Sequence, residues 1–323
     1  MAILKVKNIK KYFSLREGIF GGRRTLKAVD DVSFEVDENR VFAVVGESGS
    51  GKSTLGRLIV RLLDPTGGTV SFREKDIYAL RGKDLKKFRK SVQIIFQDPY
   101  ASLNPRMRIF SAIAEPLRIH HLVPRQMLRE RVAELLLSVG LSPDMMDKYP
   151  HEFSGGQRQR ICIARALSLS PELIIADEPL SALDVSIQAQ ILTLLQDLKE
   201  KHRLSFIFIS HDLNIVHYFS DEVAVMYLGK IVEQAAAEEI FANPLHPYTE
   251  LLLKSAPKVY AESGTARKAG GSRNGADIPS PIDIPPGCPY HPRCPKRFSE
   301  CDKVNPPLLD KNGHLVSCLL YRE

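Results

Sequence analysis

Cysteine is scarce over most of this chain: Cys162 is the only one before residue 288, and the other four lie in the terminal segment. No apolar run approaches the roughly 18 residues needed to cross a bilayer. The N-terminus "MAILKVKNIKKYF" is interrupted by lysines, which a secretory signal would not tolerate. We therefore expect a cytosolic protein, and if it works at a membrane, another subunit must span that membrane.

The sequence also lacks internal repeats of 20–50 residues and sustained heptads. Its 323 residues are 44% hydrophobic and 26% charged, which is ordinary for a globular protein. The formal net charge is +7. A basic surface suits an anionic partner, such as a nucleotide, a nucleic acid or a lipid surface, without choosing among them.

Short β-rich runs alternate with helical patterns up to about residue 255, which favours an α/β fold. "VFAVVG" (41–46), "LIIAD" (173–177) and "SFIFIS" (205–210) have the pattern of buried strands. Residues 185–202 have the apolar periodicity of a helix. A helical stretch at about 98–170 interrupts the strand pattern and predicts an inserted helical subdomain, and the N-terminal region is rich in strand formers.

The composition changes after residue 255. Residues 261–287 are rich in glycine, serine and proline, which predicts a flexible linker over 256–284. A small cysteine-rich module of loops then occupies 285–323. The sequence thus predicts a cassette over 1–255, a linker and a terminal module.

A phosphate-binding motif, "GESGSGKST" (46–54), follows one predicted strand and precedes a helical pattern. Its glycines let backbone N–H groups surround phosphates, and the helix N-terminus adds positive potential. Lys52 would reach the β- and γ-phosphates, and Ser53 would supply a hydroxyl to Mg²⁺.

The strand "LIIAD" continues into Glu178, so that two acids stand at its carboxyl end. Ligands of open α/β sheets bind at that edge. Asp177 would hold Mg²⁺ and Glu178 would activate the attacking water as general base. Acidic residues often end strands, so this pair alone would be weak evidence of a site. Its position downstream of the phosphate-binding motif is what indicates a nucleotide site.

Further motifs follow in a fixed order, and together the chain from 1 to about 255 resembles the ATP-binding cassette (ABC) ATPases. "FSGGQRQR" (153–160) is similar to the family's signature motif, although Phe153 stands where leucine is usual. Gln97 in "IIFQDPY" matches the Q-loop, and His211 in "FISHDL" matches the switch histidine. Phe13 matches the residue that stacks on adenine, with Tyr12 the weaker candidate.

The resemblance implies a P-loop NTPase core of the ABC type, with a helical subdomain, an N-terminal β-rich region and the cysteine module added. Gln97, Glu178 and His211 would be the catalytic residues. ATP would be bound by Phe13, Gly46, Glu47, Ser48, Gly49, Ser50, Gly51, Lys52, Ser53 and Thr54, and Mg²⁺ by Ser53, Gln97 and Asp177. The signature residues Ser154, Gly155, Gly156 and Gln157 would act on the nucleotide of a partner cassette, next to a D-loop of Ser181, Ala182, Leu183 and Asp184.

Two classes of ABC ATPase compete for this chain: transporter motors, and soluble proteins of DNA repair or translation. Repair proteins insert long coiled coils between the halves, and translation proteins carry two cassettes, which favours a transporter. "DEPLSALDVSIQAQIL" (177–192), "ANPLHPYTELLLKSAP" (242–257) and the cysteine module are similar to dipeptide/oligopeptide transporter ATPases. Nickel and oligosaccharide importers remain alternatives.

The resemblance also implies the partners: a second cassette, which would be a paralogue or a second copy, two transmembrane permeases, and indirectly a solute-binding protein. It implies no nucleic-acid partner. In the family, residues 98–107 would meet a helix of a permease. We therefore expect a peripheral subunit at the cytoplasmic face of the cell membrane.

The terminal cysteines are Cys288, Cys294, Cys301 and Cys318. A reducing cytosol disfavours disulfides, and common zinc sites use more closely spaced pairs. The residues alone leave open a metal, redox-sensitive thiols or packing. The resemblance implies a 4Fe–4S cluster held by these four, with Zn²⁺ as the alternative and His291 or His314 as substitute ligands. Cys162 is expected to be a core thiol.

Because no residue of the terminal module belongs to an ATP-site motif, we expect loss of Cys294 and its metal to leave the ATP site chemically intact.

Overall fold

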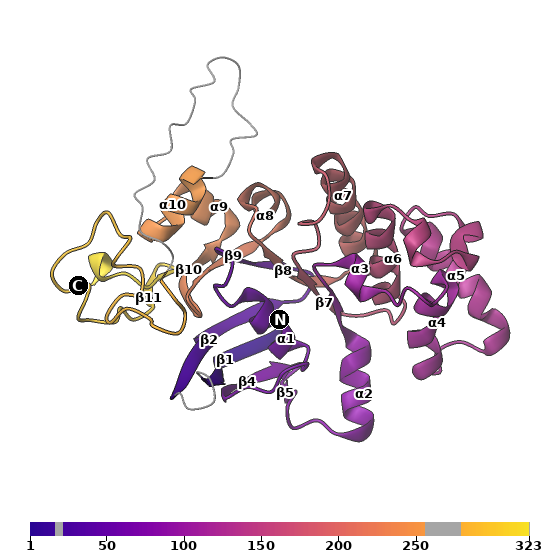
Figure 1. The fold of residues 1–323 in the computed structure, drawn as a ribbon, viewed down its shortest axis with the longest axis horizontal. Coiled ribbons are helices and arrows are strands. Elements are labelled where there is room, and N and C mark those ends of the chain that lie inside the picture. Colours follow the sequence, from indigo (N-terminus) through magenta and orange to yellow (C-terminus); the bar gives the residue numbers. More distant parts are fainter. Residues whose placement is uncertain (17–21, 256–278, 323) are drawn as a thin grey trace, which may run out of the picture.

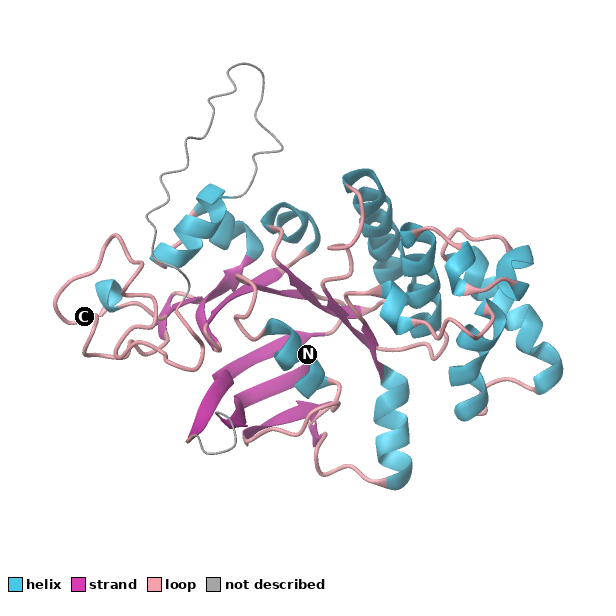
Figure 2. Ribbon diagram, in the orientation of Figure 1, coloured by secondary structure: helices cyan, strands magenta, loops and turns pink. Residues whose placement is uncertain are grey.

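The computed structural model describes residues 1–16, 22–255 and 279–322. The predicted linker at 256–284 therefore lies outside the described residues except for its last six positions. Figure 1 shows two sheets that meet near the middle of the molecule, with helices around them and the C-terminus at one end. Figure 2 separates the strands of both sheets from the helices that flank them.

The larger sheet has the strand order β11-β12-β10-β9-β3-β8-β7-β6. The strands from β9 to β6 are parallel to one another, and β10, β11 and β12 join them by antiparallel pairing. Their bounds are β3 Val41–Val45, β6 Val92–Ile95, β7 Leu173–Asp177, β8 Ser205–Ser210, β9 Glu222–Tyr227, β10 Lys230–Ala236, β11 Leu309–Lys311 and β12 His314–Val316.

The central strands are buried on both faces, as their continuous apolar sequences predict. Along β3, Ala43 packs into the core on the side of the helical region, and Phe42 and Val44 pack into the core on the side of the N-terminal sheet. Phe208 and Ile209 of β8 divide in the same way. The alternation of side chains along each strand thus gives the sheet two cores.

The smaller, antiparallel sheet has the order β2-β1-β4-β5. Its strands are β1 Ala2–Arg16, β2 Arg23–Asp37, β4 Gly67–Phe72 and β5 Lys75–Asp76. The helix α1, Lys52–Ile59, contributes Leu55, Leu58 and Ile59 to the core that this sheet shares with the larger one. The helix α2, Gly82–Ser91, leads from the small sheet to β6.

The chain between β6 and β7 is mostly helical. It contains α3 Pro99–Ser102, α4 Ile109–Ile119, α5 Leu128–Ser138 and α6 Gly155–Leu167, with 3-10 turns at Arg125–Met127, Pro143–Asp147 and Pro150–Glu152. These helices lie together at the right of Figure 1, beside α7, Val185–His202. The predicted limits of the subdomain remain a prediction.

Three further helices, α8 Leu213–Phe219, α9 Ala237–Ala242 and α10 Pro247–Ser255, lie along one side of the large sheet. Among the described residues, none of the helices has both the length and the apolar character that crossing a membrane requires.

The C-terminal segment joins the large sheet. The hairpin of β11 and β12 pairs with β10, so that Val316 lies opposite Glu233. A 3-10 turn at Leu319–Tyr321 follows. Tyr290 is buried in the core of the cassette, where its ring lies beside those of Tyr227 and Tyr248. The segment is therefore docked on the sheet.

Candidate functional site

The loop of residues 46–51 leaves β3 and enters α1, as the motif predicts. Two of its glycines are required by close backbone contacts. A Cβ atom at Gly46 would come within 2.2 Å of the Met226 carbonyl oxygen, and one at Gly51 within 2.1 Å of the Ala28 carbonyl oxygen. Gly51 also has φ +106°, which favours glycine. The loop can therefore curve tightly in front of the sheet.

Lys52 is 4% exposed and reaches back over this loop. Its Nζ donates to the carbonyl oxygens of Gly46 at 2.8 Å and Glu47 at 3.0 Å. Burial lowers the pKa of Lys52, while the carboxylates of Glu178, Asp177 and Glu47 oppose that shift. The ammonium group thus lies within the curve that a phosphate would enter.

Ser53 and Asp177 meet at the start of α1. The Ser53 hydroxyl donates to Asp177 Oδ1 at 2.8 Å. Burial raises the pKa of Asp177, which is 3% exposed, and the bond from Ser53 partly opposes this. Two oxygen ligands suited to Mg²⁺ therefore lie side by side, and Mg²⁺ in nucleotide sites takes its remaining ligands from water and phosphate.

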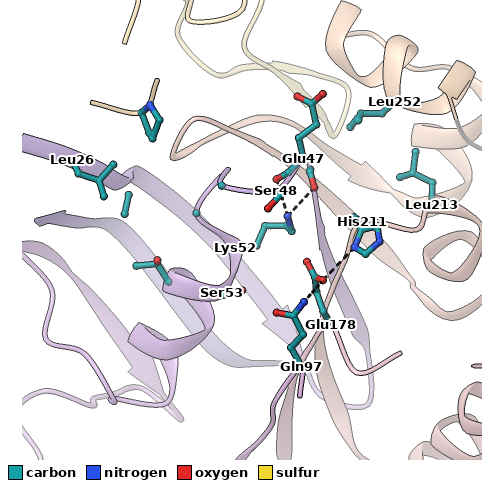
Figure 3. Close-up of a pocket in the computed structure, with 16 residues that line it drawn as sticks. Leu26, Glu47, Ser48, Lys52, Ser53, Gln97, Glu178, His211, Leu213 and Leu252 are labelled. Carbon is teal, nitrogen blue, oxygen red and sulfur yellow. Dashed lines mark hydrogen bonds and ion pairs between the residues drawn. The ribbon is translucent and has the colours of Figure 1, made fainter. Parts of the chain in front are cut away.

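Gln97, Glu178 and His211 converge from three loops at the carboxyl ends of β6, β7 and β8 (Figure 3). Glu178 Oε2 accepts from Gln97 Nε2 at 3.0 Å and lies 3.3 Å from His211 Nδ1. Glu178 has φ +47°, a strained conformation for a residue with a side chain. Its N–H donates to the Ile209 carbonyl oxygen at 3.0 Å, which helps to hold that conformation.

A cavity of about 710 Å³ connects these groups, which is within the usual size of a ligand pocket. The predicted ATP-binding residues that line it are Gly46, Glu47, Ser48, Gly49, Gly51, Lys52, Ser53 and Thr54. Ser50 is buried, and its carbonyl oxygen accepts from Gly229 N–H at 2.9 Å. Gln97, Glu178 and His211 also line the cavity.

The two aromatic candidates for adenine lie on β1. Phe13 pairs with Leu26 of β2, and Leu26 lines the cavity whereas Phe13 does not. Opposite residues of an antiparallel pair project to the same face, so Phe13 stands beside the lining of the cavity. The hydroxyl of Tyr12 donates to Asp30 Oδ1 at 2.5 Å, which gives Tyr12 a structural partner instead.

The signature residues form the N-terminus of α6. Ser154 Oγ accepts from Gln157 N–H at 3.3 Å, and Gln157 Oε1 accepts from Ser154 N–H at 3.0 Å, a capping box. A Cβ atom at Gly156 would lie 2.6 Å from Ile187 Cγ2 of α7, so only glycine fits there without a shift. None of the four residues lines the cavity around this chain's own P-loop.

The predicted D-loop connects the acid pair to α7. Ser181 Oγ donates to the Glu178 carbonyl oxygen at 3.1 Å. Ala182 is exposed, Leu183 packs against the core, and Asp184 precedes the first residue of α7. The predicted D-loop is therefore hydrogen-bonded to the backbone of Glu178.

Comparisons with known proteins agree with this geometry. The sequence model "ABC transporter" matches residues 29–181, and "Oligopeptide/dipeptide transporter, C-terminal region" matches residues 232–301. The chain is 48% identical to the oligopeptide transport ATP-binding protein AppF of Bacillus subtilis, over 99% of this chain and 97% of AppF. It is 45% identical to the dipeptide transport ATP-binding protein DppF of Escherichia coli, over 98% and 93%.

This chain belongs to the ATP-binding subunits of the oligopeptide/dipeptide ABC transporter family.

Solved ABC cassettes share its fold. The cbiO1 protein of Clostridium perfringens, part of the transporter complex cbiONQ, is 30% identical with a TM-score of 0.63 over 75% of this chain and 91% of that one. The cassette MJ0796, in a dimeric post-hydrolysis state bound to ADP and Pi, is 28% identical with a TM-score of 0.65 over 72% and 98%. The predicted ABC-type ATPase fold is confirmed.

The ABC cassette recruits residues to its ATP cavity that the motifs do not predict. Leu252 of α10 and Pro281 line the cavity together with the P-loop residues. The N–H of Glu47 donates to the hydroxyl of Tyr248 at 2.9 Å, and the carboxylate of Glu47 is bound by Arg293. The terminal module therefore contacts the P-loop directly, although none of its residues belongs to an ATP-site motif, and the expected effect of losing Cys294 on the ATP site stays a prediction. No local pattern signals these contacts, since they join residues about 200 positions or more apart in the chain.

The four terminal cysteines of this ABC ATPase line one small cavity, together with His246 and His291. All five cysteines are free, and Cys162 is buried in the cassette core as predicted. Burial raises the pKa of Cys288 to about 11, and the other three cysteines of the cavity reinforce this. His314 does not line the cavity, because its Nε2 lies 2.7 Å from Glu233 Oε1, so it is not a substitute ligand here.

The cysteine cavity does not have the arrangement of a formed metal centre. Within the described ranges, no group of three or more His, Cys, Asp or Glu side chains has the geometry to hold a metal ion. The only structural support for an iron–sulfur or zinc site among the described residues is therefore that the four thiols line one cavity.

Proposed function

We propose that this ABC ATPase binds MgATP in the cavity of its P-loop and hydrolyses it when a partner cassette closes over the nucleotide. The observation that carries this proposal is that Lys52, Ser53, Gln97 and Glu178 line one cavity, with Asp177 bonded to Ser53 at its edge, whereas none of the signature residues lines it. Lys52 would bind the β- and γ-phosphates, and Ser53 and Asp177 would hold Mg²⁺. Mg²⁺ would favour the ionised form of Asp177 and neutralise phosphate charge.

Glu178 would be the general base. Its carboxylate lies at the end of β7 beside Gln97 and His211, which would hold it and the attacking water in place. Phosphoryl transfer needs positioning and charge stabilisation more than covalent chemistry. The hydrogen bond from Gln97 and the nearby imidazole of His211 would supply that positioning.

Ser154, Gly155, Gly156 and Gln157 would contact the γ-phosphate held by the partner's P-loop. The N-terminus of α6 carries the N–H groups and positive potential suited to an anion. The solved cassette MJ0796 is dimeric, which supports a sandwich of two cassettes here.

A mixture of Ser154→Arg and Lys52→Ala chains tests the contact in trans, if the cassettes form homodimers. Both lesions then fall on one interface site, and the other site stays intact, so mixed dimers should keep a substantial part of the ATPase activity. Each variant alone should be inactive as a dimer. Mixed dimers as inactive as the single variants would contradict the trans arrangement.

The cargo would be dipeptides or oligopeptides, imported through two permeases at the cytoplasmic face of the membrane. The match at residues 232–301 and the names of AppF and DppF support peptides over nickel or oligosaccharides. Vesicles with the complete transporter should couple ATP hydrolysis to uptake of a labelled peptide, and Ni²⁺ uptake by the same vesicles would overturn the peptide assignment.

We also propose that Cys288, Cys294, Cys301 and Cys318 bind a 4Fe–4S cluster, with Zn²⁺ as the alternative. Their convergence on one cavity supports this, and the four sulfurs would have to turn toward a common centre. Such a group would cross-link loops that have little core of their own.

Metal analysis of anaerobically purified protein tests the proposal. We expect iron and sulfide, and Cys294→Ser should lose them while Cys162→Ser, away from the cavity, keeps them. Zinc without iron or sulfide would contradict the cluster and support the Zn²⁺ alternative. Absence of both metals would leave four packed thiols.

A further inference from the structure

The terminal segment reaches the P-loop through one ion pair. Arg293 Nη1 donates to Glu47 Oε2 at 2.7 Å, and Nη2 donates to Oε1 at 2.9 Å. The two side chains are 13% and 25% exposed. A two-pronged guanidinium–carboxylate pair of this kind is among the stronger hydrogen-bonded contacts in proteins, and partial burial reduces its screening.

Glu47 is held at its other polar groups as well. Its N–H donates to the Tyr248 hydroxyl at 2.9 Å, and its carbonyl oxygen accepts from Lys52 Nζ at 3.0 Å. Glu47 is also one of the residues that line the ATP cavity (Figure 3). Glu47 is thus held by Lys52 of its own loop, by Tyr248 of α10 and by Arg293 of the terminal segment.

Arg293 itself is well anchored. Its guanidinium carbon lies 6.0 Å from the centre of the Tyr227 ring and 5.9 Å from that of Tyr290. Tyr290 is 1% exposed, and its carbonyl oxygen accepts from Arg293 N–H at 3.0 Å. The next residue, Cys294, lines the cysteine cavity. The position of the arginine therefore depends on how this part of the chain is docked.

A carboxylate in the wall of a phosphate-binding cavity opposes the binding of an anionic nucleotide such as MgATP, because like charges repel strongly where water is partly excluded. Neutralisation by a cation that points away from the phosphate removes this cost. We infer that Arg293 is a positioning residue for ATP binding: it neutralises Glu47 and holds its carboxylate back from the phosphates. The inference rests on the ATP site proposed above.

Removal of the arginine tests this inference. Arg293→Ala should weaken MgATP binding by the full chain on the order of tenfold at low salt. The defect should shrink as salt rises, since salt partly screens the repulsion between the phosphates and the unpaired Glu47 carboxylate, whose side chain is 25% exposed. Arg293→Lys keeps the charge but loses the fork, and should bind ATP within about threefold of the unmodified chain.

The matched control is Lys296→Ala. Lys296 pairs with Glu250 of α10 and so also joins the terminal segment to the cassette, but neither residue lines the ATP cavity. ATP affinity should be unchanged in this variant. Equal loss of affinity in Lys296→Ala and Arg293→Ala would reduce the effect to general loosening and overturn the inference.

The most direct test compares Arg293→Ala in the unmodified chain with Arg293→Ala in a chain that also carries Glu47→Gln. Without the carboxylate there is no charge to neutralise, so Arg293→Ala in that background should cost less than about threefold in affinity. An undiminished tenfold loss there, or no loss in Arg293→Ala alone, would overturn the inference. Failure of the proposed function is a different result: the unmodified chain and Lys296→Ala would both fail to bind ATP.

Discussion

The ATP cavity and the cysteine cavity lie against the same eight-stranded sheet, but they are built in different ways. The ATP cavity takes its polar groups from loops that directly continue β3, β6, β7 and β8, and those groups are already paired with one another. The cysteine cavity takes its thiols from a chain with few regular elements, docked by one short hairpin and by side chains such as Tyr290 and Arg293. Catalytic geometry here comes from strand ends, whereas the terminal segment depends on contacts with residues already in place.

The largest effect is expected from a change at the end of β7, where Glu178 lies in the ATP site. Glu178→Gln keeps the shape of the side chain but loses the base, so kcat of the assembled transporter should fall about 10³-fold. ATP binding should persist, and an ATP-bridged dimer should accumulate and be detectable by sedimentation. Glu172→Gln, at an exposed pair with Arg73, is the control. Normal turnover in Glu178→Gln would remove Glu178 from the role of base.

A smaller effect is expected at the phosphate end of the ATP cavity. Lys52→Ala removes a charged donor from the loop, and charge-assisted hydrogen bonds are worth enough that ATP affinity should fall about 10- to 100-fold. Isothermal titration with MgATP measures this. Lys254→Ala, on the exposed side of α10, should bind normally. Unchanged affinity in Lys52→Ala would contradict the assignment of the phosphate site.

His314→Ala tests how the terminal segment is docked. His314 of β12 bonds Glu233 of β10, which is completely buried and also accepts from the N–H groups of Leu245 and His246. Loss of one partner of a buried carboxylate should lower the free energy of unfolding by about 2 kcal/mol. Urea unfolding measures this, with His202→Ala at the exposed end of α7 as control. A change below about 0.5 kcal/mol would mean that this pair does not anchor the segment.

The smallest expected effect lies where the two regions meet. Tyr248→Phe removes the acceptor of the Glu47 N–H while keeping the packed ring, which should cost about 1 kcal/mol, or roughly fivefold in ATP affinity. Tyr218→Phe, whose side chain is exposed, is the control. An ATP affinity equal to that of the control would show that the Glu47 N–H has no need of this bond.

The ATP site could be predicted in most of its parts because its motifs are local. The helix predicted at 185–202 is α7, and the predicted strands at 173–177 and 205–210 are β7 and β8. A loop between a buried strand and a helix can place Gly46 to Ser53 in few ways, since the sheet and the helix axis fix its ends. The meeting of Asp177 with Ser53 follows because β3 and β7, on either side of β8, both end at the same edge of the sheet.

The contacts of the terminal segment could not be predicted in this way. The pairing of Arg293 with Glu47, and of β12 with β10, joins residues far apart in the sequence, and nothing in the spacing of the cysteines specifies either contact. Tyr290 carries no motif, yet it fills the core beside Tyr227 and Tyr248. Only the packed structure indicates that these rings form one cluster.

The hairpin of β11 and β12 also determines what the large sheet offers to other molecules. Without it, β10 would present unpaired backbone groups along its free side, which is the template on which foreign strands add and aggregates begin. With it, the outermost strand is the three-residue β11, which carries Asp310 and Lys311. Short, charged border strands resist such growth. A chain shortened before residue 279 should therefore precipitate during expression, an effect separate from the ATP affinity that it loses with Arg293.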